Sequence, residues 1–115
     1  MKTVLIALAA LVATGAVAKE SVCAKWEFGE PEELKKCLAQ QATAKAFIQE
    51  YMNRYNMRSS IQAEQALRQG RGAALLFSEC ARLGTVGGVE DLAEVASCLK
   101  YREAQEKAAG TDLTK

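Results

Sequence analysis

The stretch from Pro31 to Asn56 reads PEELKKCLAQQATAKAFIQEYMNRYN and lies in the longest glycine-free part of the chain. Its proline is the first residue, where a helix tolerates the missing N–H, and Glu32 and Glu33 follow near the positive end of the helix dipole. Apolar side chains recur at steps of three and four residues, namely Leu34, Cys37, Leu38, Ala44, Ile48, Met52 and Tyr55. This spacing predicts a central amphipathic helix.

The apolar stripe of this helix weakens between Gln41 and Lys45. An unbroken helix over all 26 residues would be about 39 Å long, which is long for so small a chain. The sequence is therefore compatible with one long helix or with two helices that meet at Gln41–Lys45.

The first 18 residues have the three parts of a secretory signal peptide. Lys2 supplies the positive start, Val4 to Val12 form the apolar run, and Ala16-Val17-Ala18 is a small-x-small cleavage pattern. We predict cleavage after Ala18 and a secreted, extracellular protein, and a bacterial periplasm fits the same signal. No second apolar run reaches spanning length, so no transmembrane segment is expected in the mature chain. The expected mature parts are a helical domain over 19–109 and a disordered tail over 110–115.

The charge balance argues against nucleic-acid partners. Without residues 1–18 the chain loses Lys2 and no acidic residue, which leaves 14 basic and 14 acidic side chains. A protein that neutralises phosphates needs a basic excess, which this chain lacks. The same balance argues against a simple cationic lytic peptide.

Four cysteines, Cys23, Cys37, Cys80 and Cys98, indicate two disulfides in a small exported chain. Three pairings are open. Pairing of sequence neighbours would join the lead-in to the central helix and close a final helical hairpin. In straight antiparallel helices, however, Cys80 and Cys98 would be offset by about 9 Å, whereas bonded cysteines need Cα atoms within about 7 Å. The alternatives join Cys37 to Cys80 or to Cys98.

The remainder of the chain predicts three further helices. Ser59 and Gln62 form an S-x-x-Q capping box that opens a helix ending at Gln69. Ala73 to Leu83 shows a single apolar face, and Gly84 follows it. The last helix is expected from Val89 to Ala109, with its apolar stripe lost after Leu99. No run alternates long enough for a strand. The predicted fold is all-α, a small bundle of four to five helices stapled by two disulfides.

The residue types argue against catalysis. The chain has no histidine, which removes the commonest general base and the commonest metal ligand. The acidic residues Glu27, Glu30, Glu32 and Glu33 cluster at a helix start, where the dipole and solvation explain them. We therefore expect no enzyme activity, no cofactor and no metal site.

Two features point to a binding surface. The segment YMNRYNMR, Tyr51 to Arg58, combines tyrosine, methionine and arginine, which are enriched at interfaces. Methionine and tyrosine at helical spacing more often pack in a core, which is the alternative for Met52 and Tyr55. Gln40 to Leu75 also holds five basic residues against two acidic ones. The predicted partner-binding residues are Tyr51, Arg54, Tyr55, Arg58, Arg68 and Arg71.

These features favour a secreted protein that acts by binding a protein partner, as an effector or toxin-like factor. One alternative is a carrier that encloses a small apolar ligand between its helices. Its candidate lining would be Phe47, Ile48, Met52, Leu76 and Phe77. A second alternative is a membrane-active or antimicrobial protein that uses the basic middle segment.

Overall fold

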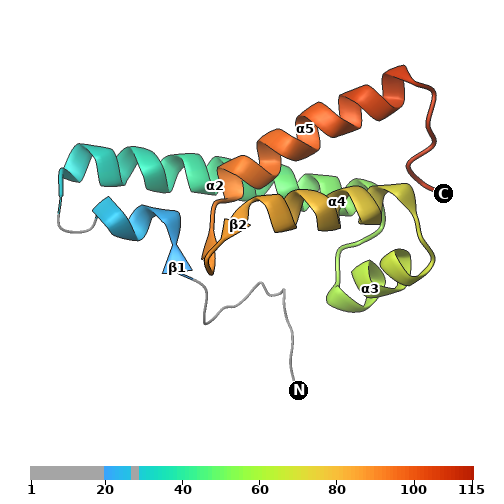
Figure 1. Ribbon diagram of the computed structural model, residues 1–115, viewed down its shortest axis with the longest axis horizontal. Helices are drawn as coiled ribbons and strands as arrows, with labels where there is room; N and C mark the ends of the chain where they lie inside the picture. The colour runs from blue at the N-terminus through green and yellow to red at the C-terminus, as the bar shows by residue number, and fades with distance from the viewer. Residues whose placement is uncertain (1–19, 27–28) are drawn as a thin grey trace.

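A computed structural model describes residues 20–26 and 29–115 of the chain (Figure 1). The described part contains four α-helices, so the predicted all-α class is confirmed. The predicted signal peptide lies outside the described residues. Among those that are described, no helix combines the length and the apolar character needed to cross a membrane. In chain order the elements are β1 (Glu20–Ser21), the 3-10 helix η1 (Val22–Trp26), α2 (Pro31–Arg54), α3 (Ser60–Arg68), α4 (Gly72–Leu83), β2 (Thr85–Val86), β3 (Val89–Glu90) and α5 (Leu92–Ala108).

Helix α2 is one continuous helix of 24 residues and does not break at Gln41–Lys45. The polar interruption of its apolar stripe has a different role. Gln41 Nε2 donates to Asp91 Oδ1 over 2.9 Å, and Gln41 Oε1 accepts from the Leu92 N–H over 2.9 Å. Asp91 is the N-cap of α5. The first N–H groups of a helix have no partner within the helix. Gln41, from the middle of α2, accepts from one of these N–H groups of α5 and donates to the side chain of its N-cap residue.

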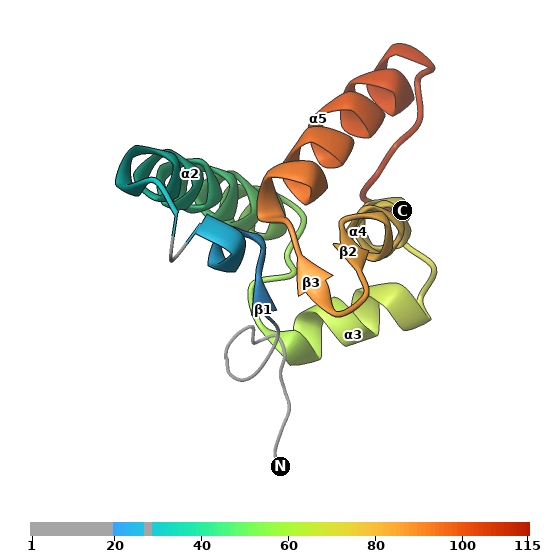
Figure 2. The same cartoon turned by 60° about the vertical axis from the view of Figure 1, so that its left-hand side comes forward.

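Helix α3 begins with the predicted capping box. The Ser59 hydroxyl accepts from the Gln62 N–H, and the Gln62 side chain accepts from the Ser59 N–H. Left-handed residues flank the helix on both sides, Asn56 at φ 58° and Gly70 at φ 70°. These two turns change the direction of the chain, and α3 lies across α4 on the side away from the far end of α5 (Figures 1 and 2).

The connection between α4 and α5 differs from the predicted loop. Residues Thr85–Val86 and Val89–Glu90 form a small antiparallel hairpin, and β1 adds to it in parallel, in the order β1-β3-β2 (Figure 2). The prediction of no strand was therefore wrong, because two-residue strands are too short for an alternating pattern to register. Gly84 ends α4 at φ −87°, and a Cβ there would meet Val95 and the Asp91 carbonyl. Gly84 thus permits the close approach of α5.

The disulfides pair sequence neighbours, Cys23 with Cys37 and Cys80 with Cys98. The first joins η1 to α2. The second joins α4 to α5 with a Cα–Cα distance of 5.5 Å. The offset expected for Cys80 and Cys98 is reduced because α5 begins at Leu92, three residues later than predicted, after the hairpin.

The core lies where α2, α3, α4 and α5 meet. Its largest fully buried side chains include Tyr51, Met57 and Leu99. Small residues allow close packing of the helices, and Ala66 is the one buried residue of α3. The full cluster is Tyr51, Met57, Ala66, Ala73, Ala74, Leu76, Cys80, Val95, Leu99 and Leu113.

The C-terminal segment, residues 110–115, was predicted to be disordered, and in the structure it packs against the start of α4. The Leu113 side chain is buried, and the carbonyls of Leu113 and Lys115 accept from the N–H groups of Ala73 and Gly72 over 2.9 and 2.7 Å. Hydrogen bonds from the Thr114 side chain and N–H hold the pKa of Asp112 below its usual value. The segment is thus held in place by the burial of Leu113 and by two N–H groups at the start of α4, which have no partner within their own helix.

Candidate binding surface

The structure divides the six predicted contact residues among three places. Tyr51 belongs to the core, Arg54 and Tyr55 belong to a polar cluster between α2 and α5, and the three remaining arginines lie on the surface around α3. The Tyr51 side chain is fully buried and its hydroxyl donates to the Ala73 carbonyl over 2.8 Å. Its predicted place on an exposed surface is therefore corrected, because a residue without exposed atoms has none to offer a partner.

The polar cluster is organised by Glu103 of α5, which is 7% exposed. Its Oε2 accepts from the Tyr55 hydroxyl over 2.5 Å and from Arg54 Nη1 over 3.2 Å, and Lys107 Nζ lies 3.6 Å away. The Arg54 guanidinium also lies over the Tyr51 and Tyr55 rings, 5.9 and 5.7 Å from their centroids. A buried carboxylate needs such partners to offset its desolvation. This cluster therefore joins the end of α2 to α5.

The tyrosines of this region are stabilised in their neutral form. Burial, then the charges of neighbouring groups, raises the pKa of Tyr51 well above its ordinary value. Burial, together with the hydrogen bond to Glu103 and the negative charge of that group, raises the pKa of Tyr55 to about 12. Neither tyrosine is an acid or base that operates near neutral pH. The arrangement is structural.

We use the name α3 face for a set of surface residues on α3 and in the turns on either side of it, namely Arg58, Ile61, Leu67, Arg68 and Arg71. Ile61 is 67% exposed and Leu67 is 42% exposed. Arg68 pairs with Glu64 on the same helix, whereas Arg58 and Arg71 have no carboxylate partner among the described residues. The α3 face thus combines accessible apolar side chains with two cations, Arg58 and Arg71, that have no carboxylate partner in the described part of the chain.

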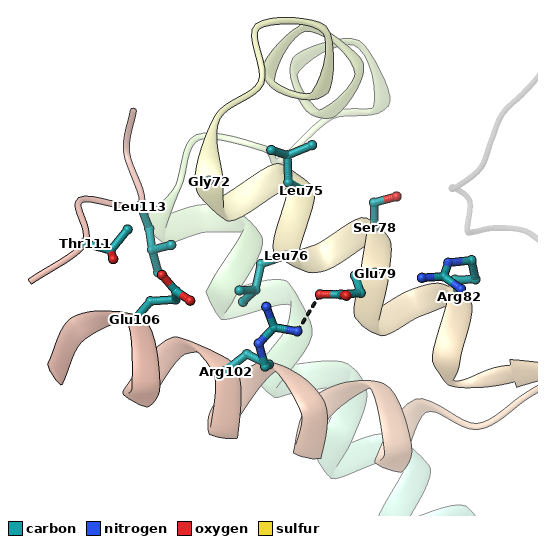
Figure 3. A pocket seen from close by; sticks show the side chains of 10 residues that line it. All are labelled: Gly72, Leu75, Leu76, Ser78, Glu79, Arg82, Arg102, Glu106, Thr111 and Leu113. Carbon is teal, nitrogen blue, oxygen red and sulfur yellow. Dashed lines mark hydrogen bonds and ion pairs between the residues drawn. The ribbon is translucent and has the colours of Figure 1, made fainter. Parts of the chain in front are cut away.

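A second surface feature is a hollow of about 450 Å³ between α4, α5 and the C-terminal segment, which we call the α4–α5 groove (Figure 3). Leu76 and Leu113 form part of its wall, and an ion pair between Glu79 and Arg102 connects the two helices beside it. Figure 3 shows Leu75 directed from α4 toward the side where α3 lies. The groove and the α3 face are therefore neighbouring parts of the surface.

The five residues predicted to line a carrier cavity fill the core instead. Leu76 belongs to the core cluster, and Phe47, Ile48, Met52 and Phe77 pack against it. Of these five, only Leu76 borders the α4–α5 groove, and none borders a smaller hollow of about 230 Å³ beside Gln41 and Asp91. Across residues 20–26 and 29–115 no group of three or more histidine, cysteine, aspartate or glutamate side chains is placed to hold a metal ion.

The sequence prediction missed the residues that give these surfaces their character. Glu103 lies in the part of α5 where the apolar stripe was predicted to be lost, although it follows Leu99 by four residues, which places it on the buried face. That spacing could have revealed it. The proximity of Gly72 and Ala73 to Leu113 and Lys115 has no such signal, because it depends on how residues 110–115 fold back.

The comparisons with known proteins add no family to this description. No protein-family model matches the chain, and no curated protein and no solved structure matches it either.

Proposed function

We propose that this protein is an exported, non-catalytic protein that acts by binding another protein through the α3 face, in the manner of an effector or toxin-like factor. Its two disulfides are compatible with an extracellular protein. The observation that carries the proposal is the exposure of Ile61 and Leu67 on α3, a helix attached to the core through its alanine residues and flanked along the chain by Arg58 and Arg71.

The energetics of α3 support this interpretation. Leaving Ile61 exposed forgoes roughly 1–2 kcal/mol of burial, which a partner surface would recover. Arginine and large apolar side chains are the types that dominate binding energy at interfaces. These residues do little for the fold of the monomer, because α3 is anchored by Ala66 and by its capping box.

The charge of this surface specifies the partner. Between Asn56 and Gly72 the chain has three arginines and one acidic residue, Glu64, which is paired with Arg68. The fitting partner therefore presents acidic side chains around an apolar contact for Ile61. Such charge complementarity raises the association rate and selects among partners more than it raises affinity.

The test is cross-linking of the native protein in the fluid into which it is exported, with the captured polypeptide measured by mass spectrometry. A charge-reversed variant, Arg58→Glu with Arg68→Glu and Arg71→Glu, is expected to lose capture at least about tenfold. The matched control, Lys35→Glu with Lys36→Glu and Lys45→Glu, makes the same charge change on exposed positions of α2. The proposal fails if both variants capture the same polypeptide as the wild type.

The two alternative functions have distinct outcomes in the same material. A lipid or other small apolar molecule that co-purifies in native mass spectrometry, without a captured polypeptide, would favour the carrier. Dye release from anionic vesicles that requires the three arginines of the α3 face would favour a membrane-active protein.

A further inference from the structure

The α4–α5 groove has opposite charges at its two ends. Figure 3 shows Glu106 beside Leu113 at one end and Arg82 at the other end of α4, with the Glu79–Arg102 pair between them. Neither Glu106 nor Arg82 takes part in an ion pair with another described residue. Leu75 is 51% exposed between these ends. The groove therefore presents an acid at one end and a base at the other, with the exposed Leu75 and a paired acid and base between them.

The position of Glu106 is not explained by the stability of the fold. It lies in the last turns of α5, which ends at Ala108. The helix dipole is negative there and disfavours an acidic side chain. A carboxylate at such a position, without an ion-pair partner in the described chain, is free to meet a cation from another molecule.

The size and polarity of the groove select the class of occupant. Arg82, at one end, lies ten positions along α4 from Gly72 at the other, which corresponds to about 15 Å. A small anion would reach only one end. A lipid chain would need a dry apolar lining, whereas four of the ten lining residues are charged, namely Glu79, Arg82, Arg102 and Glu106. A polypeptide segment with charged side chains on either side of an apolar one matches both the length and the charges.

We propose that the α4–α5 groove binds a segment of a partner protein that carries a cation for Glu106, an apolar side chain for Leu75 and Leu113, and an anion for Arg82. This inference rests on the proposed function in taking the partner to be a protein. Because Leu75 points toward the side on which α3 lies, one partner can contact the groove and the α3 face together.

The test uses three helical peptides of about 15 residues, identical except at two positions about three turns apart on one face. Peptide one carries lysine and glutamate there, peptide two carries two lysines, and peptide three carries two glutamates, and each has leucine between them. They are titrated against the disulfide-bonded protein, and binding is followed through amide chemical shifts of the groove residues. The wild type is expected to prefer the mixed peptide by roughly threefold over either other peptide.

Charge-reversed variants make the test independent of the direction in which a peptide lies. Glu106→Lys makes both ends of the groove basic and is expected to prefer the two-glutamate peptide. Arg82→Glu makes both ends acidic and is expected to prefer the two-lysine peptide. Equal binding of all three peptides, binding that leaves the groove amides unshifted, no binding at millimolar peptide, or preferences that do not follow the variants would each overturn the proposal.

The α3-face variant separates this inference from the proposed function. It is expected to keep the wild-type peptide preference, because its three arginines lie outside the groove lining. If peptide preference is absent while cross-linking still depends on the α3 face, only the groove proposal fails. If peptide preference follows the groove charges while cross-linking ignores the α3 face, only the proposed function fails.

Discussion

Tyr55, at the end of α2, donates its hydroxyl hydrogen to the Oε2 of Glu103 in α5 over 2.5 Å. The bond connects two residues 48 positions apart, and Arg54 donates to the same oxygen. Because Glu103 is almost fully buried, each partner that it holds counts toward the stability of the fold. The polar cluster thus joins α2 to α5 beside the part of α2, from Phe47 to Met52, that packs in the apolar core.

Replacement of Glu103 by alanine is expected to lower the free energy of unfolding by about 1–3 kcal/mol, because Tyr55 loses its buried acceptor and Arg54 its partner. Urea unfolding followed by circular dichroism measures the change. The control is Glu50→Ala, an exposed position on α2, for which a change within about 0.5 kcal/mol is expected. Equal effects of the two substitutions would show that the cluster contributes nothing.

Stability is expected to fall between pH 10 and pH 12. The pKa of Tyr55 is raised from 10.0 to about 12 in the folded protein, and the pKa of Tyr51 is raised as well. The folded state keeps phenolic protons that the unfolded chain releases, so the stabilisation is complete below pH 10 and is lost as the pH rises through 12. Urea midpoints across this range measure it. Tyr55→Phe should reduce the slope, and an unchanged slope would contradict the assignment.

Replacement of Gln41 by alanine is expected to cost about 1–2 kcal/mol, because the Leu92 N–H and the Asp91 carboxylate lose their partner from α2. Hydrogen exchange should show faster opening of the first turn of α5. The neighbouring Gln40→Ala is the matched control, since Gln40 is exposed. A Gln41 variant as stable as the Gln40 variant would mean that solvent replaces the bridge at no cost.

Replacement of Leu113 by alanine is expected to release residues 110–115 from α4. The free energy of unfolding should fall by about 2 kcal/mol, which is at the lower end of the range for replacing a buried leucine by alanine. The effect is small because a terminal segment can detach without leaving a cavity in the core. Exchange of the Gly72 and Ala73 amide hydrogens, which now bond to Lys115 and Leu113, should become fast. Lys115→Ala, which changes an exposed side chain only, should leave both amides protected.

Local signals in the sequence determined the helical elements well. The α3 capping box, the start of α2 at Pro31 and the single apolar face of α4 involve residues within one or two turns of each other. Such interactions are encoded by spacing alone. The even cysteine count likewise predicted two disulfides without any knowledge of the fold. The pairing of the cysteines, in contrast, depended on where α5 begins.

The position of each candidate contact residue could not be predicted from spacing along the sequence. The sequence placed Tyr51, Arg54, Tyr55, Arg58, Arg68 and Arg71 on one face because they are close along the chain or share a charge. In the folded protein a single turn of α2 carries Tyr51 into the core and leaves Arg54 at its edge. Composition cannot distinguish these two fates, because arginine and tyrosine serve both interfaces and cores.

By itself, the sequence determined the helical class, the cysteine count and the starts of α2 and α3, since these depend on periodicity and neighbouring residues. Only the tertiary structure decided that Gln41 caps α5, that Glu103 gathers Arg54 and Tyr55, and that residues 110–115 return to α4 to wall a groove. Each of these contacts joins residues about 40 or more positions apart. Such pairs are set by the packing of whole helices, and no local pattern records them.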